Sequence, residues 1–281
     1  MEKIKVTCDS TCDLTPELYH SYDIETVPIG VTLGETLYYD GVDITAQDLY
    51  DYADRTGELP KTSAVAPSRY MEVFGKYVEQ GYSVIHISLS SEISSCYQNA
   101  CLAAEEVGAV YPIDSLSLSS GSGHLALLAV ELARQGKSVQ EIVDTLNERK
   151  EKLDVSFVLQ HLDYMRMGGR CSGIAVLGAN LLKLRPEIRM QDGKMSVGTK
   201  YRGSMERSIC DYVRGRLAER DDIDPGRIFI THSGVPAEIA EKVTALVKEL
   251  QPFREVIETH AGSTISSHCG PDCLGVLFFK K

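Results

Sequence analysis

The sequence predicts an α/β protein with two domains, expected at residues 1–153 and 154–281. A parallel, doubly wound sheet is expected in the N-terminal domain, because short apolar runs alternate with helical patterns up to about residue 152. A mixed, partly antiparallel sheet is expected in the C-terminal domain, where a hairpin signal stands at Asp192-Gly193. The length of 281 residues is enough for two ordinary domains.

The first half of the chain offers clear start and stop signals. Thr15 caps a helix that opens with Pro16, Thr45 caps one that ends before Gly57, and Ser138 forms a capping box with Glu141. Strands are expected at residues 4–8, 24–33, 84–87 and 109–113. Helices are expected at residues 46–54, 70–80, 119–134 and 139–152. A short helix is expected to begin at Pro16, and a further one follows the turn at Ser94-Ser95, with Tyr97, Ala100 and Ala104 on one face.

The second half is predicted to contain more strand. Strands are expected at residues 155–159, 186–190, 194–199, 228–231, 256–259 and 274–279. Helices are expected at residues 162–167, 204–218 and 236–250, with a further small-residue helix that Ser172 caps and that runs through Leu182.

Charge and hydropathy exclude several classes of partner. The formal net charge is -11, and no basic run with interleaved aromatic residues is present, so nucleic acid is not an expected partner. No apolar run approaches the ~20 residues of a membrane-spanning helix. The N-terminal residues lead directly into a strand-like segment without a signal-peptide pattern, which predicts a cytoplasmic protein.

The eight cysteines do not form the pattern of a disulfide scaffold, since most lie in apolar or helical segments. Cys8 with Cys12 and Cys269 with Cys273 are each separated by three residues, and His260 and His268 lie near the second pair. Two such pairs far apart in the sequence are a weak zinc signal, so no metal site is expected.

The most informative stretch is Ser88 to Ala100, in which a buried strand ends in a hydroxyl-rich turn that leads into a helix. Free backbone amides at the helix start, together with the hydroxyls of Ser94 and Ser95, suit a carboxylate or phosphate. A second hydroxyl pair, Thr62-Ser63, is expected in a loop of the same domain. Loops at the carboxyl edge of a doubly wound sheet converge, so these groups are predicted to form one anion site. A serine that only caps the helix is the alternative.

Familiar nucleotide motifs are not supported. The segment Gly136-Lys137-Ser138 lacks the earlier glycine of a phosphate loop. Gly121 and Gly123 fit a dinucleotide pattern, but they lie well inside the fold and are better explained by close helix–sheet packing.

His268 lies in a glycine- and proline-rich segment expected to be a loop, where it could contact an anion or move a proton. No acid partner for a serine–histidine pair is marked.

Taken in order, these blocks resemble the DegV family of bacterial fatty-acid-binding proteins over essentially the whole chain. The matching blocks are Asp9-Ser10-Thr11, Asp13-Leu14, Val27-Pro28-Ile29, Tyr39-Asp40-Gly41, Thr62-Ser63, Ser90 to Ala100, Asp114-Ser115, Gly121, Gly123, Gly168-Gly169-Arg170, Ser172, Lys200, Arg202, His268, Gly270-Pro271 and Gly275.

The resemblance implies a carrier that is not itself catalytic and needs no cofactor. A long-chain fatty acid would lie in a tunnel between the domains, with its carboxylate at Thr62 and Ser94. Ser63, the backbone amide of Ser95 and His268 would lie close to the same head group. A separate fatty acid kinase would receive the presented carboxylate, with Arg170 and Arg202 facing that partner.

The sequence departs from the family pattern where Ser95 replaces a glycine, Cys96 replaces a threonine and Asp272 replaces a glycine. These changes affect the expected head-group site and not the fold.

Two other functions stay open. One is a hydrolase or transferase that uses Ser94 or His268 on a small acidic substrate. The other is a metal-dependent protein that uses Cys269, Cys273 and the nearby histidines.

Overall fold

The computed structural model describes residues 2–171, 173–174 and 184–281. The described strands are β1 (Ile4–Asp9), β2 (Glu25–Val27), β3 (Gly30–Leu33), β4 (Thr36–Tyr39), β5 (Lys61–Ser63), β6 (Ser83–Ser88), β7 (Val110–Asp114), β8 (Leu153–Val158), β9 (Leu184–Gln191), β10 (Lys194–Arg202), β11 (Ile223–Ser233), β12 (Glu255–His260) and β13 (Cys273–Lys280). The described α-helices are α1 (Pro16–Tyr22), α2 (Ala46–Thr56), α3 (Pro67–Val78), α4 (Cys96–Val107), α5 (Ser119–Arg134), α6 (Val139–Arg149), α7 (Asp163–Gly168), α9 (Met205–Leu217), α10 (Ala237–Leu250) and α11 (Ser263–Cys269), and two 3-10 turns are η1 (Ser10–Cys12) and η2 (Lys150–Lys152).

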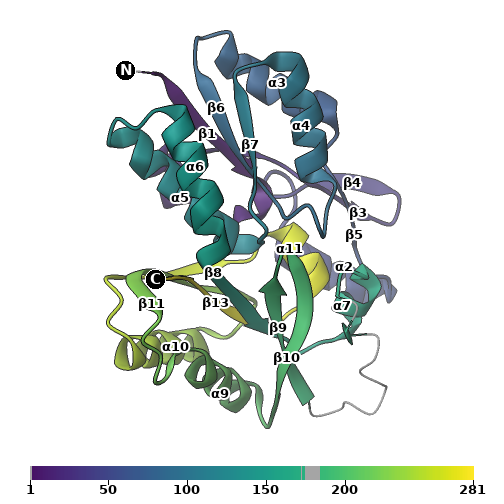
Figure 1. Cartoon of the computed structure of the whole chain (residues 1–281). Coiled ribbons are helices and arrows are strands. Elements are labelled where there is room, and N and C mark those ends of the chain that lie inside the picture. Colours follow the sequence, from purple (N-terminus) through teal and green to yellow (C-terminus); the bar gives the residue numbers. More distant parts are fainter. Residues whose placement is uncertain (1, 172, 175–183) are drawn as a thin grey trace.

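A four-stranded parallel sheet in the order β2-β1-β6-β7 forms the first half of the molecule. Helices α3 and α4 cover one face of this sheet, and α5 and α6 cover the other (Figure 1). The predicted doubly wound sheet is therefore confirmed. Its strand order changes direction between β1 and β6, and ligands of such sheets bind outside the carboxyl ends of the strands at that point.

The second half is built on a six-stranded mixed sheet in the order β10-β9-β8-β13-β11-β12. Only β11 and β12 pair in parallel, and the other neighbours are antiparallel. Helices α9 and α10 lie against the outer face of this sheet (Figure 1). The predicted hairpin joins β9 to β10, and Asp192 and Gly193 both take positive φ, as a type I′ turn requires.

A small antiparallel sheet, β4-β3-β5, was not predicted. The single strand expected at residues 24–33 is wrong, because the chain leaves the parallel sheet after Val27 and enters the small sheet at Gly30. Pro28 lies at the break, and proline lacks the N–H that a continuing ladder needs. The loop expected at Thr62-Ser63 is also wrong, since both residues belong to β5.

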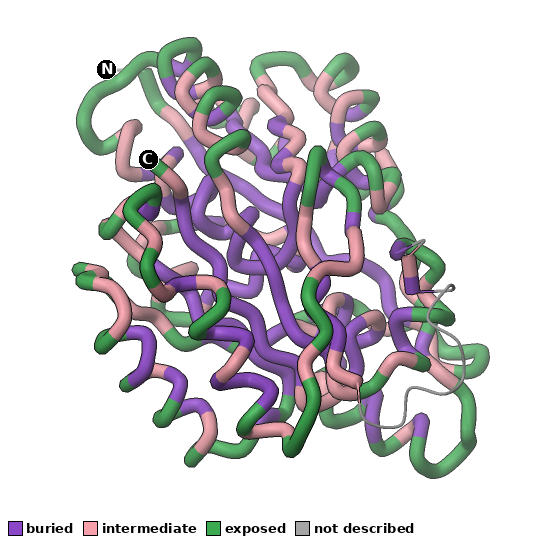
Figure 2. Tube along the Cα trace, turned by 60° about the horizontal axis from the view of Figure 1, so that its bottom comes forward, coloured by how far each residue is buried: buried purple, intermediate pink, exposed green. Residues whose placement is uncertain are grey.

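Helix α5 lies between the two large sheets and contacts strands of both. Its first residues are small and buried, so the backbone can approach its neighbours closely. One hydrophobic cluster accordingly runs from β1 and β6 through α5 to β8 and β13. Figure 2 shows this buried centre surrounded by helices that are exposed on their outer sides. The division of the chain at residues 153 and 154 stays a prediction.

Three further expectations have simple outcomes. The loop expected around His268 is wrong, because this residue lies in the last turn of α11. The helix expected from Ser172 to Leu182 lies outside the described residues. Among the described helices, none combines the length and the apolarity that crossing a bilayer demands.

The packing of α5 yields a test of stability. A Cβ at Gly123 would lie 2.8 Å from the backbone oxygen of Cys12 and 2.7 Å from Leu14, whereas a Cβ at Gly75 in α3 would meet nothing within 4 Å. We expect Gly123→Ala to lower the free energy of unfolding by about 1–3 kcal/mol through overpacking. Gly75→Ala is the matched control and should raise it by about 0.5–1 kcal/mol. Urea denaturation measures both, and equal effects would contradict this account of α5.

Candidate functional site

An apolar cavity lies where the two halves of the molecule meet. The space inside it that no atom fills, counting its opening to solvent, is about 730 Å³. Its wall is almost entirely apolar and comes from both halves, including Leu89, Leu118, Phe157, Met165, Ile265 and Leu277. The polar side chains at this wall are therefore the groups that could orient a ligand.

The first polar contact joins Thr62 of β5 to His268 of α11, which are far apart in the sequence. The Thr62 hydroxyl lies 2.8 Å from Nε2 of His268. His268 lines the cavity, and its Nδ1 is buried without a hydrogen-bond partner among the described residues. The backbone of α7 closes over this ring, because a Cβ at Gly168 would lie 2.4 Å from Nδ1. Two of the predicted site residues are thus brought together.

The charge state of His268 follows from its surroundings. Burial lowers the pKa of His268 to about 4, and the positive charge of Arg170 acts in the same direction. The imidazole is therefore neutral at pH 7. Its Nε2 forms one hydrogen bond with the Thr62 hydroxyl, and the ring places a polar but uncharged group at the cavity wall.

Ser94 and Ser95 stand at the start of α4, beside a second hollow next to the cavity. Ser95 is the N-cap residue, and the Ser94 hydroxyl accepts a hydrogen bond of 3.2 Å from the Cys96 amide. Both serines line the second hollow together with Ala64 and Arg170. Among the contacts of the described residues, Ser94 and Thr62 do not touch each other.

Arg170 connects the two spaces, since it lines both the apolar cavity and the hollow of the serines. Its guanidinium donates a hydrogen bond of 2.5 Å to the carbonyl oxygen of Gly168. The sequence assigned Arg170 to a partner surface and gave no reason to place it on the cavity wall. A cation at this position attracts anions to the place where the cavity and the second hollow adjoin.

Two carboxylates hold the beginning of α11. Asp13 accepts a hydrogen bond of 2.9 Å from the Gly262 amide, and Asp40 accepts one of 2.7 Å from the Ser263 amide. Burial raises the pKa of Asp13 well above its ordinary value, while a hydrogen bond from Ser119 opposes this rise. These acids follow β1 and β4, and the sequence singled out their segments without assigning them a role.

Two other predicted residues lie away from the cavity wall. The hydroxyl of Ser63 approaches Gly30, because successive residues of β5 point to opposite faces and Thr62 takes the face toward His268. Arg202 is exposed at the end of β10, and it lines neither the cavity nor the second hollow.

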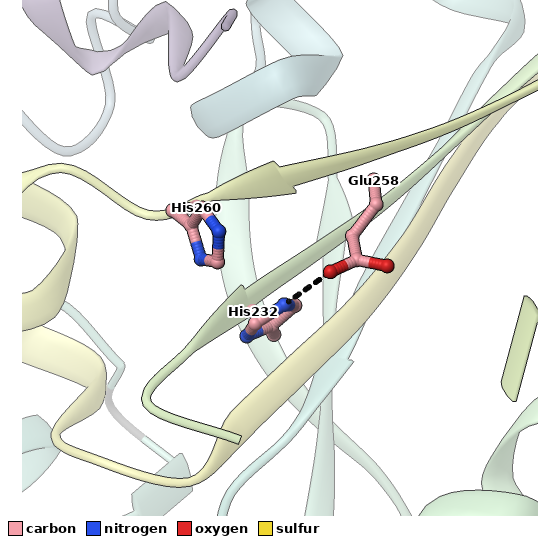
Figure 3. Close-up of side chains that lie close together, drawn as sticks. All are labelled: His232, Glu258 and His260. Atoms are coloured by element: carbon pink, nitrogen blue, oxygen red, sulfur yellow. Dashed lines mark hydrogen bonds and ion pairs between the residues drawn. The ribbon is translucent and has the colours of Figure 1, made fainter. Parts of the chain in front are cut away.

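The described residues contain one group of side chains with the spacing of metal ligands, formed by His232, Glu258 and His260 (Figure 3). The metal site considered at Cys269 and Cys273 is not this group, because His260 lies beside His232. Both cysteines are buried and free.

The fold and the cavity define an α/β protein with an apolar cavity lined by residues of both halves of the chain. The family model described as an uncharacterised protein of the DegV family matches residues 3–281. The chain therefore belongs to the DegV family. Two DegV domain-containing proteins, from Clostridium acetobutylicum and Caldanaerobacter subterraneus, are 33% and 34% identical to it over all of both chains.

Solved structures of similar proteins have the same fold. A DegV family protein from Thermus thermophilus, described by its fatty acid binding, superposes with a TM-score of 0.88 at 26% identity, covering 99% of this chain and 100% of that one. DegV of Bacillus subtilis, described as a fatty acid binding protein, gives a TM-score of 0.85 at 25% identity over all of both chains. A stearic acid-binding protein from Eubacterium ventriosum gives 0.86 at 27% identity, covering 100% and 99%.

The environment of His268 predicts how it titrates. Replacing Arg170 with Gln should raise the pKa of His268 above about 4, yet leave it below the ordinary value of about 6.5, because burial is the larger cause. NMR titration of the ring protons measures this shift, and an unchanged pKa would contradict a role for Arg170.

The depressed pKa of His268 also affects stability. Since its pKa in the folded state lies below that in the unfolded chain, the contribution of His268 to the free energy of unfolding should be lost as pH falls from about 6.5 toward 4.

Proposed function

We propose that this protein binds a long-chain fatty acid and presents its carboxylate to a separate fatty acid kinase that makes the acyl phosphate. The acyl chain occupies the apolar cavity. The carboxylate lies at the end formed by Thr62, Ser94, the Ser95 amide and His268. The observation that carries this proposal is an apolar cavity whose wall includes His268, bonded to Thr62, and Arg170, which also lines the neighbouring hollow of Ser94 and Ser95.

The wall of the cavity suits a hydrocarbon chain. Each buried methylene contributes about 0.8 kcal/mol, so about a dozen methylenes contribute on the order of 10 kcal/mol. The loss of translational and rotational freedom on association costs about 4–15 kcal/mol, so the gain from the tail is of the size needed to offset this cost. Burial of the tail therefore provides most of the affinity, and the polar end is left to fix the orientation of the ligand.

The polar end suits a carboxylate without a buried cation. The Thr62 hydroxyl, the neutral His268 ring and the amides at the start of α4 offer hydrogen bonds. Arg170 adds a positive charge from an exposed position, so no ammonium or guanidinium has to be desolvated deep in the protein. The hydroxyl of Ser63 points toward Gly30, so it is not one of these hydrogen-bonding groups.

The related structures support the same ligand class. Proteins of 25–27% identity and near-complete coverage are described as binding fatty acids, and one of them as binding stearic acid. Their folds superpose on this chain with TM-scores of 0.85–0.88, which supports the proposal of the same ligand class for this protein.

A carrier fits the geometry better than a hydrolase or transferase does. His268 bonds Thr62 and not Ser94, and its Nδ1 has no described acid partner to orient it. A general base works best with a pKa near the operating pH, whereas that of His268 is about 4. Ester turnover that disappears in Ser94→Ala would favour the enzyme instead.

The proposed ligand can be identified directly. Denaturing extraction of the purified protein followed by mass spectrometry should release a long-chain fatty acid in near-stoichiometric amount. In a displacement assay, Thr62→Val and Ser94→Ala should each weaken binding by about 1–3 kcal/mol, because each removes a hydrogen bond to a charged group. An empty preparation that also rejects added oleate and palmitate would overturn the proposal.

A matched control separates the head group from general damage to the fold. Ser21→Ala removes an exposed hydroxyl of α1 that donates to the carbonyl oxygen of Leu18, and Ser21 lines neither the cavity nor the second hollow. This variant should bind the fatty acid as the wild type does. If Ser21→Ala weakens binding as much as Ser94→Ala, the carboxylate does not lie at Ser94.

The transfer step makes a separate prediction. Arg202 is exposed and distant from the cavity wall, so Arg202→Ala should leave fatty acid affinity unchanged. With a fatty acid kinase and ATP, the same variant should give less acyl phosphate, because a cation at the docking surface is lost. Lys194, an exposed residue at the start of the same strand, supplies the control variant Lys194→Ala. Equal loss of binding and phosphorylation in Arg202→Ala would contradict a partner role.

A further inference from the structure

Three side chains outside the proposed fatty acid site meet through the register of two parallel strands. His232 of β11 lies directly opposite His260 of β12. Glu258 precedes His260 by two residues on β12, and residues two apart on a strand project from the same face. The backbone therefore places one carboxylate and two imidazoles on one face of the sheet, near the ends of both strands.

The distances within this cluster suit metal coordination. One ligand atom from each residue lies within 4.8 Å of those of the other two. Nε2 of His232 lies 3.2 Å from a carboxylate oxygen of Glu258, and the two rings have centroids 4.6 Å apart. Figure 3 shows the three side chains turned toward a common space.

We propose that His232, Glu258 and His260 bind a divalent transition-metal ion of the zinc class. Two imidazole nitrogens and one carboxylate oxygen are a known three-residue ligand set for zinc, with the fourth position left to water. Harder ions such as Mg²⁺ and Ca²⁺ prefer sites made mainly of oxygen atoms, so the two histidines select against them.

The protonation state of the cluster allows binding without a large rearrangement. The ring of His232 must offer the Nε2 lone pair to the metal, which places its proton on Nδ1. No described residue bonds Nδ1, so no existing hydrogen bond opposes that tautomer. On binding, Nε2 releases its proton, Nδ1 takes one up, and the bond to Glu258 is replaced by coordination of both groups to the ion.

One side of the cluster is buried in the protein, and the other side is exposed to solvent. The His232 side chain is 4% exposed, whereas that of Glu258 is 43% exposed and His260 is exposed as well. Because Glu258 and His260 are exposed, an ion can reach them from solvent. His232 also lines the apolar cavity, so the metal site and the cavity share a wall without sharing the polar residues of the proposed head-group site.

Titration of chelator-treated protein with Zn²⁺ by calorimetry tests the site, and Co²⁺ reports tetrahedral coordination through its visible absorption. We expect a single equivalent to bind. Glu258→Gln and His260→Ala should each weaken binding at least about tenfold. Both changes are at exposed positions, so the melting curves of the metal-free variants should match that of the wild type. His161→Ala, which removes another exposed histidine, is the matched control and should bind like the wild type.

Two results would overturn the proposal. One is the absence of saturable binding by the wild-type protein. The other is equal affinity in the wild type and in both cluster variants, which would place the ion on other groups such as the free cysteines. Neither result bears on fatty acid binding, which the extraction experiment tests separately.

Discussion

The position of His268 at the cavity wall depends on how the first turn of α11 is held. This helix has seven residues, and isolated helices shorter than about 12–15 residues are marginal in water. Its position is fixed by two carboxylates from the first half of the chain, which accept hydrogen bonds from the Gly262 and Ser263 amides. A Cβ at Gly262 would lie 2.9 Å from a carboxylate oxygen of Asp40, so only a residue without a side chain fits closely there.

The consequence reaches the other end of the same helix. His268 lies in its last turn, where it meets Thr62 of the small antiparallel sheet. Asp13, Asp40 and Thr62, which belong to three separate segments of the first half, thus determine the position of the His268 ring in the second half. A change in either acid would move His268 relative to Thr62 even though neither acid lines the apolar cavity.

The sequence predicted those parts of the fold that carry periodic patterns or caps, such as the parallel sheet and the hairpin across Asp192-Gly193. It missed the small sheet because its strands have three or four residues, too few for a periodic pattern, and because their pairing is non-local. It misread α11 as a loop because serine and threonine, which dominate this segment, have low helix propensity. Arg170 could not be placed from the sequence, since nothing local shows which wall it lines.

In the proposed site the apolar wall binds the acyl chain and the polar groups bind the carboxylate. This separation shows which of the two each departure from the family pattern affects. A methylene contributes about 0.8 kcal/mol, so an apolar wall that admits or excludes two carbons changes affinity by about tenfold. A hydrogen bond to a charged head group contributes a similar amount once, whatever the length of the chain. Ser95 and Cys96 lie at the start of α4, beside the polar hollow, and therefore bear on the orientation of the carboxylate. Preference among chain lengths instead belongs to the apolar residues of the cavity, which come from both large sheets and from α11.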